Sequence, residues 1–253
     1  MPDPRAWSEA ALQTASHELE ARSLEDMLTW VDEHFSPGVS LASSFGGLSG
    51  MVLVDAVARL KLPFEIFYLD TDLLFPETYQ TVARVKERYG LQPVAYATPL
   101  SLPDQAREHG GELWQRDPDL CCRLRKVEPN RAALQGKTAW VTGIRRDQTG
   151  NRQAVPLLEW DDGFGLLKVN PIAAWTEDET RAYIEAHDVP YNALLDRGFR
   201  SIGCLPCTRA VLPGEDPRAG RWSGLEKTEC GLHLRPSSLP VLAPSSGVEQ
   251  RQP

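Results

Sequence analysis

The five cysteines of this 253-residue chain fall into four that could bind a metal and one that could act as a nucleophile. Cys121 and Cys122 are adjacent, whereas Cys204 and Cys207 form a Cys-x-x-Cys pair much later in the chain. A single Cys-x-x-Cys could be a redox pair, half of a zinc site or two buried small residues. Two pairs together could supply four thiolates to zinc or to an iron–sulfur cluster.

The adjacency of Cys121 and Cys122 favours a cluster. Neighbouring side chains point in different directions on a helix or a strand, so two adjacent thiolates do not easily converge on one tetrahedral ion. They can more easily bind different irons of one cubane. We therefore expect a [4Fe–4S] cluster, with zinc, or a disulfide, redox or simply buried role, as the alternatives.

Cys230 has the surroundings expected of a reactive thiol. It lies in the polar, glycine-containing segment 229–233, which should leave it accessible, and nearby cations could favour its thiolate. Three cations that precede it in the sequence, Arg218, Arg221 and Lys227, could do so. A buried, inert cysteine is the alternative. His233 could orient or polarise the thiol, or could be a structural hydrogen-bonding residue.

The chain is acidic overall, with a formal net charge of −8, but it contains one basic stretch. From Cys121 to Arg152 there are eight basic and two acidic residues, a local charge of +6. The net charge argues against nucleic acid as a partner, because such binding depends on a basic face. The basic stretch instead suggests a small anionic ligand, or else a solvated charged surface.

Length and composition favour one large α/β domain, since 42% hydrophobic residues can form a sizeable core. The N-terminal residues lack the apolar stretch of a secretory signal, and no segment approaches the roughly 18 apolar residues needed to cross a bilayer. An odd number of cysteines does not suit a secreted disulfide scaffold. We therefore expect a soluble, cytoplasmic protein without a membrane partner.

Alternating strands and helices predict a mainly parallel sheet with right-handed crossovers. Strands are expected at residues 39–43, 65–69, 92–97 and 138–144, with a hairpin over 157–160 and 164–169. Helices are expected at 24–35, from the end of the loop 44–49 to about residue 60, at 76–89, after the paired cysteines, and from Thr176 to about residue 187. Capping boxes at Ser23 and Thr176 begin the first and last of these helices.

Three loops follow predicted strands at the sheet edge where open α/β proteins bind ligands. The first, Ser43-Ser44-Phe45-Gly46-Gly47, could cradle phosphate, although it lacks the Lys-Ser/Thr of a Walker A motif and could be a plain turn. The second, Asp70-Thr71-Asp72, could contact a metal or a ribose, or could only form a turn. In the third, Arg145 and Arg146 could bind phosphate or sulfate, or remain solvated.

Seven segments, taken in order, resemble the assimilatory adenylyl-sulfate reductases, the iron–sulfur branch of the phosphoadenosine phosphosulfate reductase family. They span roughly residues 40 to 233. The segments are Ser44-Phe45-Gly46-Gly47; Leu69-Asp70-Thr71 with Leu74-Phe75-Pro76-Glu77-Thr78; Cys121-Cys122-x-x-Arg125-Lys126-Val127-Glu128-Pro129; Gly143-Ile144-Arg145-Arg146-Asp147-Gln148; Ser201-Ile202-Gly203-Cys204-x-Pro206-Cys207-Thr208; Arg218-Ala219-Gly220-Arg221-Trp222; and Glu229-Cys230-Gly231-Leu232-His233.

The resemblance implies an adenine-nucleotide alpha-hydrolase-like (Rossmann-like) α/β fold with a C-terminal catalytic segment. It also implies reduction of adenosine 5′-phosphosulfate to sulfite and AMP, in sulfate assimilation and cysteine biosynthesis. In the family's mechanism the cysteine matching Cys230 attacks the sulfate sulfur, AMP leaves, and thioredoxin or glutaredoxin releases sulfite from the S-sulfocysteine. The cluster belongs to the substrate's electrostatic environment and does not pass electrons.

The resemblance also assigns roles to residues of this chain. A thiolate that attacks an anionic sulfonate meets like-charge repulsion, so cations must surround the site. The residues matching cluster ligands are Cys121, Cys122, Cys204 and Cys207. The expected catalytic residues are Cys230, Lys126 and His233. The expected substrate contacts are Ser43, Ser44, Phe45, Gly46, Gly47, Leu69, Asp70, Thr71, Arg125, Arg145, Arg146, Arg218 and Arg221.

From the same resemblance we divide the chain into a nucleotide-binding domain with the cluster site (1–208), a flexible catalytic segment (209–235) and a disordered tail (236–253). The chain departs from the family pattern at Asp72, where glycine is common, and in the nucleotide loop. A reductase of the 3′-phosphorylated nucleotide, or one that accepts both substrates, is the nearest alternative. An ATP pyrophosphatase-like ligase and an iron–sulfur nucleotide sensor are more distant ones, and a homo-oligomer is left open.

Overall fold

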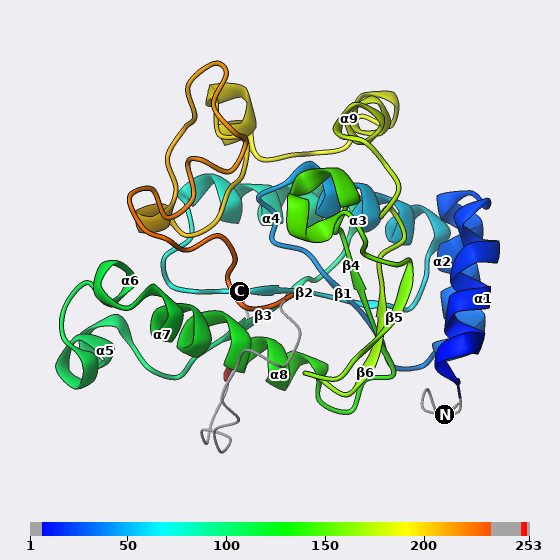
Figure 1. Cartoon of the computed structure of the whole chain (residues 1–253), viewed down its shortest axis with the longest axis horizontal. Helices are drawn as coiled ribbons and strands as arrows, with labels where there is room; N and C mark the ends of the chain where they lie inside the picture. The colour runs from blue at the N-terminus through cyan, green and yellow to red at the C-terminus, as the bar shows by residue number, and fades with distance from the viewer. Residues whose placement is uncertain (1–6, 234–248, 252–253) are drawn as a thin grey trace.

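The computed structural model describes residues 7–233 and 249–251 of the chain. Within these residues lies a seven-stranded sheet with the order β5-β6-β4-β1-β2-β3-β7 (Figure 1). Its strands are β1 (Val39–Ala42), β2 (Glu65–Leu69), β3 (Val94–Ala97), β4 (Ala139–Thr142), β5 (Leu158–Asp161), β6 (Leu166–Val169) and β7 (Glu249–Arg251). The inner strands are all parallel, and the two edge strands β5 and β7 are antiparallel to their neighbours, which confirms a mainly parallel sheet.

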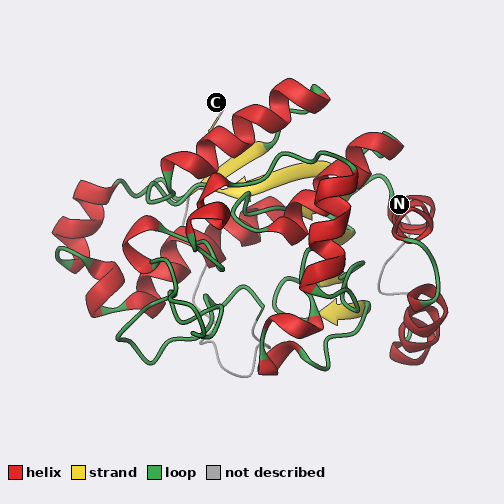
Figure 2. Ribbon diagram, turned by 90° about the horizontal axis from the view of Figure 1, so that it is seen from above, coloured by secondary structure: helices red, strands yellow, loops and turns green. Residues whose placement is uncertain are grey.

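Helices cover both faces of the sheet (Figures 1 and 2). They are α1 (Glu9–Glu20), α2 (Leu24–Phe35), α3 (Leu48–Leu60), α4 (Pro76–Tyr89), α5 (Leu102–His109), α6 (Leu113–Arg116), α7 (Pro118–Cys122), α8 (Glu128–Leu134) and α9 (Glu177–Ala186). Figure 1 shows α3, α4 and α9 on one side of the sheet and α7 and α8 on the other. The fold is therefore a sheet enclosed between two helical layers.

Each face of the sheet has its own hydrophobic core. Along β2, Ile66 and Tyr68 belong to the larger core, which contains α2 and α3, whereas Phe67 belongs to a smaller core with Leu134 of α8 and Trp140 of β4. Side chains alternate between the faces of a strand, so a strand covered on both sides is apolar throughout. This is why the predicted strands read as continuous apolar runs.

The predicted elements are confirmed to within a few residues at their ends. Ser23 and Thr176 cap α2 and α9 as expected, through hydrogen bonds from the backbone N–H groups of Asp26 and Glu179. The hairpin is also confirmed, because β5 and β6 pair antiparallel. The sequence analysis did not anticipate α1, which begins after Ser8, whose side chain accepts a hydrogen bond from the Ala11 N–H.

The predicted disordered tail needs a correction at residues 249–251. These residues form β7, which pairs antiparallel with β3, and the Gln250 Nε2 donates to the Tyr96 hydroxyl at 3.0 Å. Their sequence, Glu-Gln-Arg, has no apolar alternation to announce a strand. The unpaired backbone of an edge strand can accept almost any extended segment, which explains the pairing. The other residues of the expected tail, 236–248 and 252–253, lie outside the described part.

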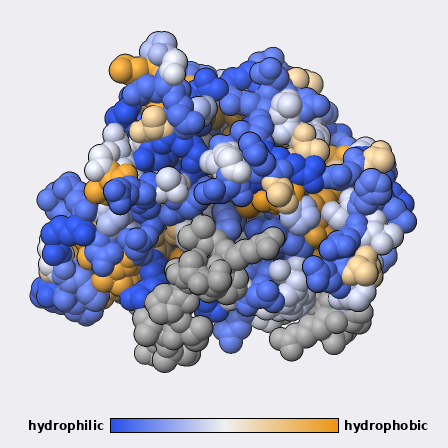
Figure 3. Space-filling view, viewed as in Figure 1, coloured by the Kyte–Doolittle hydropathy of each residue, from blue (hydrophilic) through white to orange (hydrophobic). Residues whose placement is uncertain are grey.

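Parallel pairing of β1 with β2 and β4 places the carboxyl ends of these strands at one edge of the sheet. The loops 43–47, 70–72 and 143–148 therefore lie at that edge, as expected. The surface seen in Figure 3 is mainly hydrophilic with scattered hydrophobic residues. Among the described residues, no helix is both long and apolar enough to span a membrane.

Asp55 of α3 joins three helices and provides a test of the fold. Its carboxylate is buried and accepts hydrogen bonds of 2.8 Å from the hydroxyls of Tyr89 on α4 and Tyr183 on α9. Asp55→Ala would leave both partly buried tyrosine hydroxyls without this acceptor, so we expect the free energy of unfolding to fall by about 2–4 kcal/mol in urea denaturation. Glu87→Ala, at an exposed position of α4, is the matched control and should change it by less than about 0.5 kcal/mol. A loss no larger than that of the control would contradict this role.

Candidate active site

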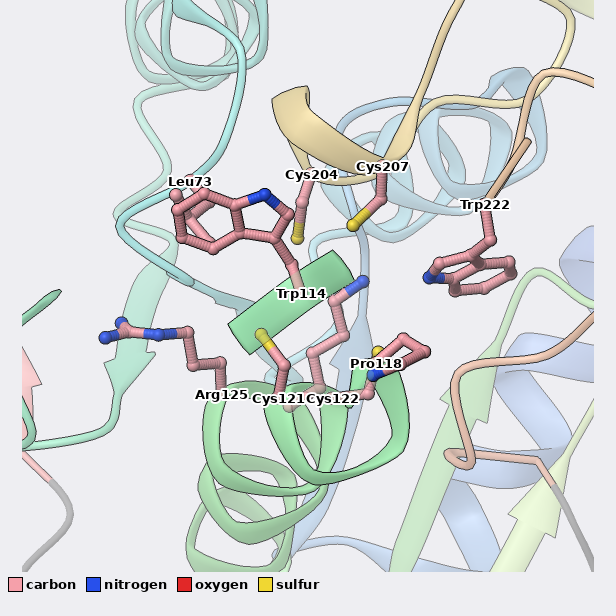
Figure 4. A pocket seen from close by; sticks show the side chains of 10 residues that line it. Leu73, Trp114, Pro118, Cys121, Cys122, Arg125, Cys204, Cys207 and Trp222 are labelled. Carbon is pink, nitrogen blue, oxygen red and sulfur yellow. The ribbon is translucent and has the colours of Figure 1, made fainter. Parts of the chain in front are cut away.

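The two cysteine pairs meet at one pocket. Cys121 and Cys122 end α7, while Cys204 and Cys207 flank the short 3₁₀ turn η6 (Leu205–Cys207). All four line the same pocket, and Figure 4 shows Cys121 facing Cys204 and Cys207 across it. Every cysteine of the chain is free, and only Cys207 and Cys230 are partly exposed. The tertiary structure thus brings together two pairs that are far apart in the sequence.

The loop after β2 holds the second pair in place. The Thr71 hydroxyl lies 3.3 Å from the Cys204 sulfur, within hydrogen-bonding distance. The backbone N–H of Leu205 donates to the Leu73 carbonyl at 2.7 Å. Leu69 and Thr71 were both expected to contact substrate. Thr71 lies beside Cys204, whereas Leu69 packs against the smaller hydrophobic core. The second pair is therefore anchored directly to the carboxyl end of β2.

A π-helical turn shapes the first pair's side of the pocket. The side chain of Asp117 caps α7 by accepting from the Leu120 N–H at 2.9 Å, and the π-helical segment η2 (Arg123–Val127) continues the chain into α8. Such turns are rare in helices and occur mostly at functional sites. Here the wider turn allows both Arg125 and Lys126 to line the pocket beside the cysteines. We did not anticipate this π-helical turn from the sequence.

The residue types in the pocket suit thiolate ligation of a metal. Burial, followed by the charges of the other cysteines, raises the pKa of Cys121 to about 12 and that of Cys207 to about 11. Thiolates in this pocket therefore need a bound cation. Among the residues described, no group of three or more His, Cys, Asp or Glu is placed so that it could hold a metal ion.

Arg125, expected to contact substrate, has a structural task instead. Its side chain is 1% exposed, and its guanidinium donates to Gln105 Oε1 at 2.7 Å and to Asp72 Oδ2 at 3.0 Å. It also donates to the carbonyls of Thr71 and Leu100 at 3.1 and 3.0 Å. A buried guanidinium must be satisfied by such partners. Because these bonds use most of its donors, Arg125 fixes the cysteine helix to the sheet edge and does not serve as a free anion ligand.

Lys126 stands between the four cysteines and Cys230. Burial lowers the pKa of Lys126, but its electrostatic interactions with Cys204, Cys230 and Cys122 outweigh that effect and raise it. The ammonium group therefore stays charged and can stabilise negative charge that develops nearby. Lys126, which the resemblance assigns to the catalytic set, lies close enough to Cys230 to interact with it electrostatically.

The segment that carries Cys230 is docked against the π-helical turn. Cys230 lies near enough to Cys122, Lys126 and Arg218 to interact with them electrostatically. A methyl group added at Gly231 would lie 3.5 Å from Cγ2 of Val127. Between Cys207 and residue 233 the chain forms turns without a helix or strand. The segment is therefore held by side-chain and turn contacts rather than by regular secondary structure.

His233 lies among cations and against an aromatic ring. Its imidazole packs edge-on against Trp140 with ring centroids 5.5 Å apart. Burial, followed by the charges of Lys168, Arg152 and Arg218, keeps the pKa of His233 well below its usual value, so the ring is neutral. Its Nδ1 is buried and has no hydrogen-bond partner within the described residues. An unpaired nitrogen of this kind is available to a ligand.

Arg218 and Arg221 approach the pocket from the C-terminal segment. The Arg218 guanidinium donates to the Thr228 carbonyl at 2.7 Å. That of Arg221 lies over the Trp222 ring at 4.4 Å, and Trp222 itself lines the cysteine pocket. A Cβ at Gly203 would come within 2.4 Å of the Arg221 guanidinium, so a larger residue beside Cys204 would require this side chain to move. These contacts connect the basic segment to the second cysteine pair.

The loop between β1 and α3 has the form expected of an anion-binding turn. Phe45 is fully buried with a positive φ of 51°, and its carbonyl accepts from the Asn192 side chain at 3.2 Å. A Cβ at Gly46 would lie 3.1 Å from Cβ of Ile202, whereas Gly47 faces open space at the N-terminus of α3. The Ser44 hydroxyl accepts from the Gly46 N–H at 3.3 Å, and Ser43 is buried. The loop is therefore packed against its neighbours at Phe45 and Gly46, and it is open to a ligand at Gly47.

Asp70 and Asp72 form a tight turn after β2. Asp70 Oδ1 accepts from the Asp72 N–H at 3.0 Å and from the Tyr79 hydroxyl at 2.7 Å. Asp72 has a φ of 57°, in the left-handed region that glycine adopts without strain, which explains why glycine is common there in the family. In this chain the aspartate uses that position to accept from Arg125.

Arg145 and Arg146 do not act as a pair. Arg145 is 6% exposed and donates to the carboxylate of Asp147 at 2.9 Å and to the Ser49 hydroxyl at 2.6 Å. Arg146 donates to the Val155 carbonyl at 2.8 Å and pairs with Glu20 of α1. The structure therefore separates the two guanidinium groups, and only Arg145 lies beside the nucleotide loop.

Sequence reasoning missed several residues around the site. Trp114 and Trp222 line the cysteine pocket, and the Trp222 indole N–H is buried without a partner among the described residues. Arg152 and Glu229 form an ion pair of 3.0 Å next to Cys230. Arg152 lies in the basic stretch and Glu229 adjoins the candidate nucleophile, so the sequence offered a reason to consider each residue as part of the site. Nothing in the sequence indicated that the two would meet.

Comparison with known proteins gives consistent matches. A family model described as the phosphoadenosine phosphosulfate reductase domain matches residues 39–210. The adenosine 5′-phosphosulfate reductase of Anoxybacillus flavithermus is 46% identical over 208 residues, covering 82% of this chain and 88% of that protein. The protein of the same name from Mycolicibacterium smegmatis is 45% identical over 217 residues, covering 86% of this chain and 91% of its own length.

A solved structure with the same fold is phosphoadenylyl-sulfate (PAPS) reductase from Candida auris in a phosphate complex. It is 32% identical, with a TM-score of 0.72, and the match covers 81% of this chain and 98% of that one. Yeast FAD synthetase, at 18% identity and a TM-score of 0.52, covers 81% of this chain and 69% of its own and shares the fold alone. The expected adenine-nucleotide alpha-hydrolase-like fold is thereby confirmed. By its matched domain and its relatives, the chain belongs to the phosphoadenosine phosphosulfate reductase family.

Proposed function

We propose that this chain reduces adenosine 5′-phosphosulfate to sulfite and AMP, with Cys230 as the nucleophile. The carrying observation is that Cys230 lies close to Lys126 and Arg218 at the cysteine pocket, beside the carboxyl edge of the sheet. The names of the relatives from Anoxybacillus and Mycolicibacterium support the same substrate. This places the chain among the enzymes that act on sulfur groups.

The first step joins the Cys230 sulfur to the sulfate sulfur. As the new S–S bond forms, the bond between the sulfate sulfur and the bridging oxygen breaks, and AMP leaves with the electron pair. Lys126, Arg218 and Arg221 would offset the repulsion between the thiolate and the anionic sulfonate, and would stabilise charge on the leaving phosphate. The neutral imidazole of His233 would offer its unpaired Nδ1 to the bound anion or to a proton on it.

The second step needs an external dithiol such as thioredoxin or glutaredoxin. One donor thiolate attacks the Cys230 sulfur, and sulfite leaves with the electron pair of the S–S bond. The second donor thiol then resolves the mixed disulfide, so the donor is oxidised by two electrons. The partial exposure of Cys230 supports access for such a partner. Movement of the catalytic segment, proposed for residues 209–235, would serve the change from substrate to donor.

Cys121, Cys122, Cys204 and Cys207 would hold a [4Fe–4S] cluster. When bound, the cluster would neutralise these buried thiolates and contribute to the electrostatic field at the substrate. Its ligands come from α7 and η6, so the protein's own contribution is to fix these two segments against the loop after β2.

The adenosine and phosphate would bind at the carboxyl edge of the sheet. Ser44 and Gly47 offer backbone N–H groups near the start of α3, where the helix dipole favours an anion. Asp70 is held by Tyr79 through one carboxylate oxygen, and its second oxygen would accept from a ribose hydroxyl. Arg145, which borders the same loop through Ser49, would add positive charge.

A direct test is to incubate the anaerobically purified protein with adenosine 5′-phosphosulfate, without a thiol donor, and to measure intact and peptide masses. We expect an added SO₃ group on Cys230, because the first step needs no reductant. Cys230→Ser should give no adduct and no turnover. The 3′-phosphorylated nucleotide is tested in parallel because the Candida auris relative is a phosphoadenylyl-sulfate reductase, and an adduct with that nucleotide alone would show that the substrate assignment is wrong. No adduct with either nucleotide would overturn the reaction class.

The cluster is tested by matched serine variants. Cys204→Ser should lower iron and acid-labile sulfide and bleach the visible absorbance, because it removes one of four ligands. Cys230→Ser removes a thiol of the same chemistry from the same region and should leave all three readings unchanged. Equal loss of iron in both variants would show that the division between ligands and nucleophile is wrong.

The charge of Lys126 is tested by Lys126→Gln. We expect kcat/KM to fall by about 10²–10³-fold, the cost of removing one group that stabilises developing charge. Lys86→Gln on α4 is the control for loss of a lysine elsewhere and should be nearly neutral. The comparison is of steady-state rates at equal iron content, and full activity of the Lys126 variant would remove this residue from the catalytic set.

A further inference from the structure

The carboxylate beside the candidate nucleophile is enclosed by two arginines. Oε2 of Glu229 lies 3.0 Å from a terminal nitrogen of Arg152 and 3.3 Å from one of Arg218. The side chains of Glu229, Arg152 and Arg218 are only 9%, 13% and 19% exposed. Removing one partner of so sheltered an ion pair leaves an uncompensated charge and is costly. The three charges should therefore hold one arrangement.

Arg152 connects this carboxylate to the nucleotide loop. Its other terminal nitrogen donates to Gln148 Oε1 at 2.5 Å. Gln148 Nε2 in turn lies 3.5 Å from the hydroxyl of Ser49, in the first turn of α3. A chain of polar contacts thus runs from the start of α3 to the residue that precedes Cys230. Neither Gln148 nor Arg152 is used by the proposed chemistry.

Arg218 fixes the same segment through its backbone. It donates to the Thr228 carbonyl at 2.7 Å while it contacts the Glu229 carboxylate. On the other side of Cys230, a Cβ added at Gly231 would lie 3.5 Å from Cγ2 of Val127, so this residue passes close to the π-helical turn. The segment is therefore bonded before Cys230 and runs close to the turn after it. Because the Glu229 carboxylate faces two guanidinium groups, the three side chains together keep a net charge of +1. They therefore still attract an anion.

We propose that Glu229 is a positioning residue, which uses the ion pairs with Arg152 and Arg218 to hold the Cys230 thiol at the substrate. The inference rests on the proposed function for the role of Cys230 as nucleophile. Glu229 does not touch the reacting atoms in this scheme. It acts by keeping the thiol in place, and a misplaced nucleophile lowers the rate of the chemical step more than it weakens substrate binding.

The test is the rate at which iodoacetamide alkylates Cys230 in the full-length, anaerobically purified protein, followed by peptide mass. Glu229→Gln keeps the size of the side chain but removes its charge, and we expect alkylation to accelerate at least about tenfold as the segment is released. Arg152→Gln should accelerate it similarly, and the double variant should add little, because both break one interaction. Glu226→Gln, three residues away and exposed, is the control and should leave the rate unchanged.

Steady-state kinetics separate positioning from a general loss of structure. Glu229→Gln should lower kcat about tenfold with little change in KM, while its iron content matches that of the wild type. An unchanged alkylation rate in Glu229→Gln, or the same acceleration in Glu226→Gln, would overturn the proposal. Alkylation requires no substrate. Faster alkylation without an SO₃ adduct on the wild type would therefore support the positioning role and refute the reductase function.

Discussion

The buried guanidinium of Arg125 is the interaction on which the geometry of the site depends. A charge that is 1% exposed persists only if its donors are satisfied, and the acceptors come from three parts of the chain: the loop after β2, Leu100 and Gln105 of α5. Arg125 follows Cys121 and Cys122 in the π-helical turn. Satisfying this one group therefore fixes the first cysteine pair relative to the sheet edge, and Thr71 does the same for the second pair.

The electrostatics of the site follow from the arrangement of charge within an acidic chain. Lys126, Arg218 and Arg221 gather at the pocket although the net charge of the protein is −8. A thiolate and a sulfonate repel each other, so an enzyme that joins them needs fixed cations in a partly water-excluded site. Glu229 moderates this concentration of positive charge without cancelling it. In the proposed mechanism, the same contacts would position Cys230 and leave the site able to bind an anion.

The nucleotide-binding sheet and the chemistry are contributed by different parts of the chain. The fold is shared with yeast FAD synthetase at 18% identity. The cysteine pocket instead depends on the π-helical turn and on turns beyond residue 200, which form no regular secondary structure up to residue 233 apart from the short 3₁₀ turn η6. Function in this family therefore lies in segments attached to a common sheet.

The sequence by itself determined the alternation of strands and helices, the capping residues Ser23 and Thr176, and the division of the cysteines, because these depend on neighbouring residues and local spacing. The tertiary structure alone decided which polar groups meet. In the folded chain Arg125 is buried, and Arg146 lies apart from Arg145. Arg152 pairs with Glu229, and β7 adds to the edge of the sheet. The physical reason is that a charged side chain takes the nearest opposite charge or acceptor in space, and sequence distance does not encode that proximity.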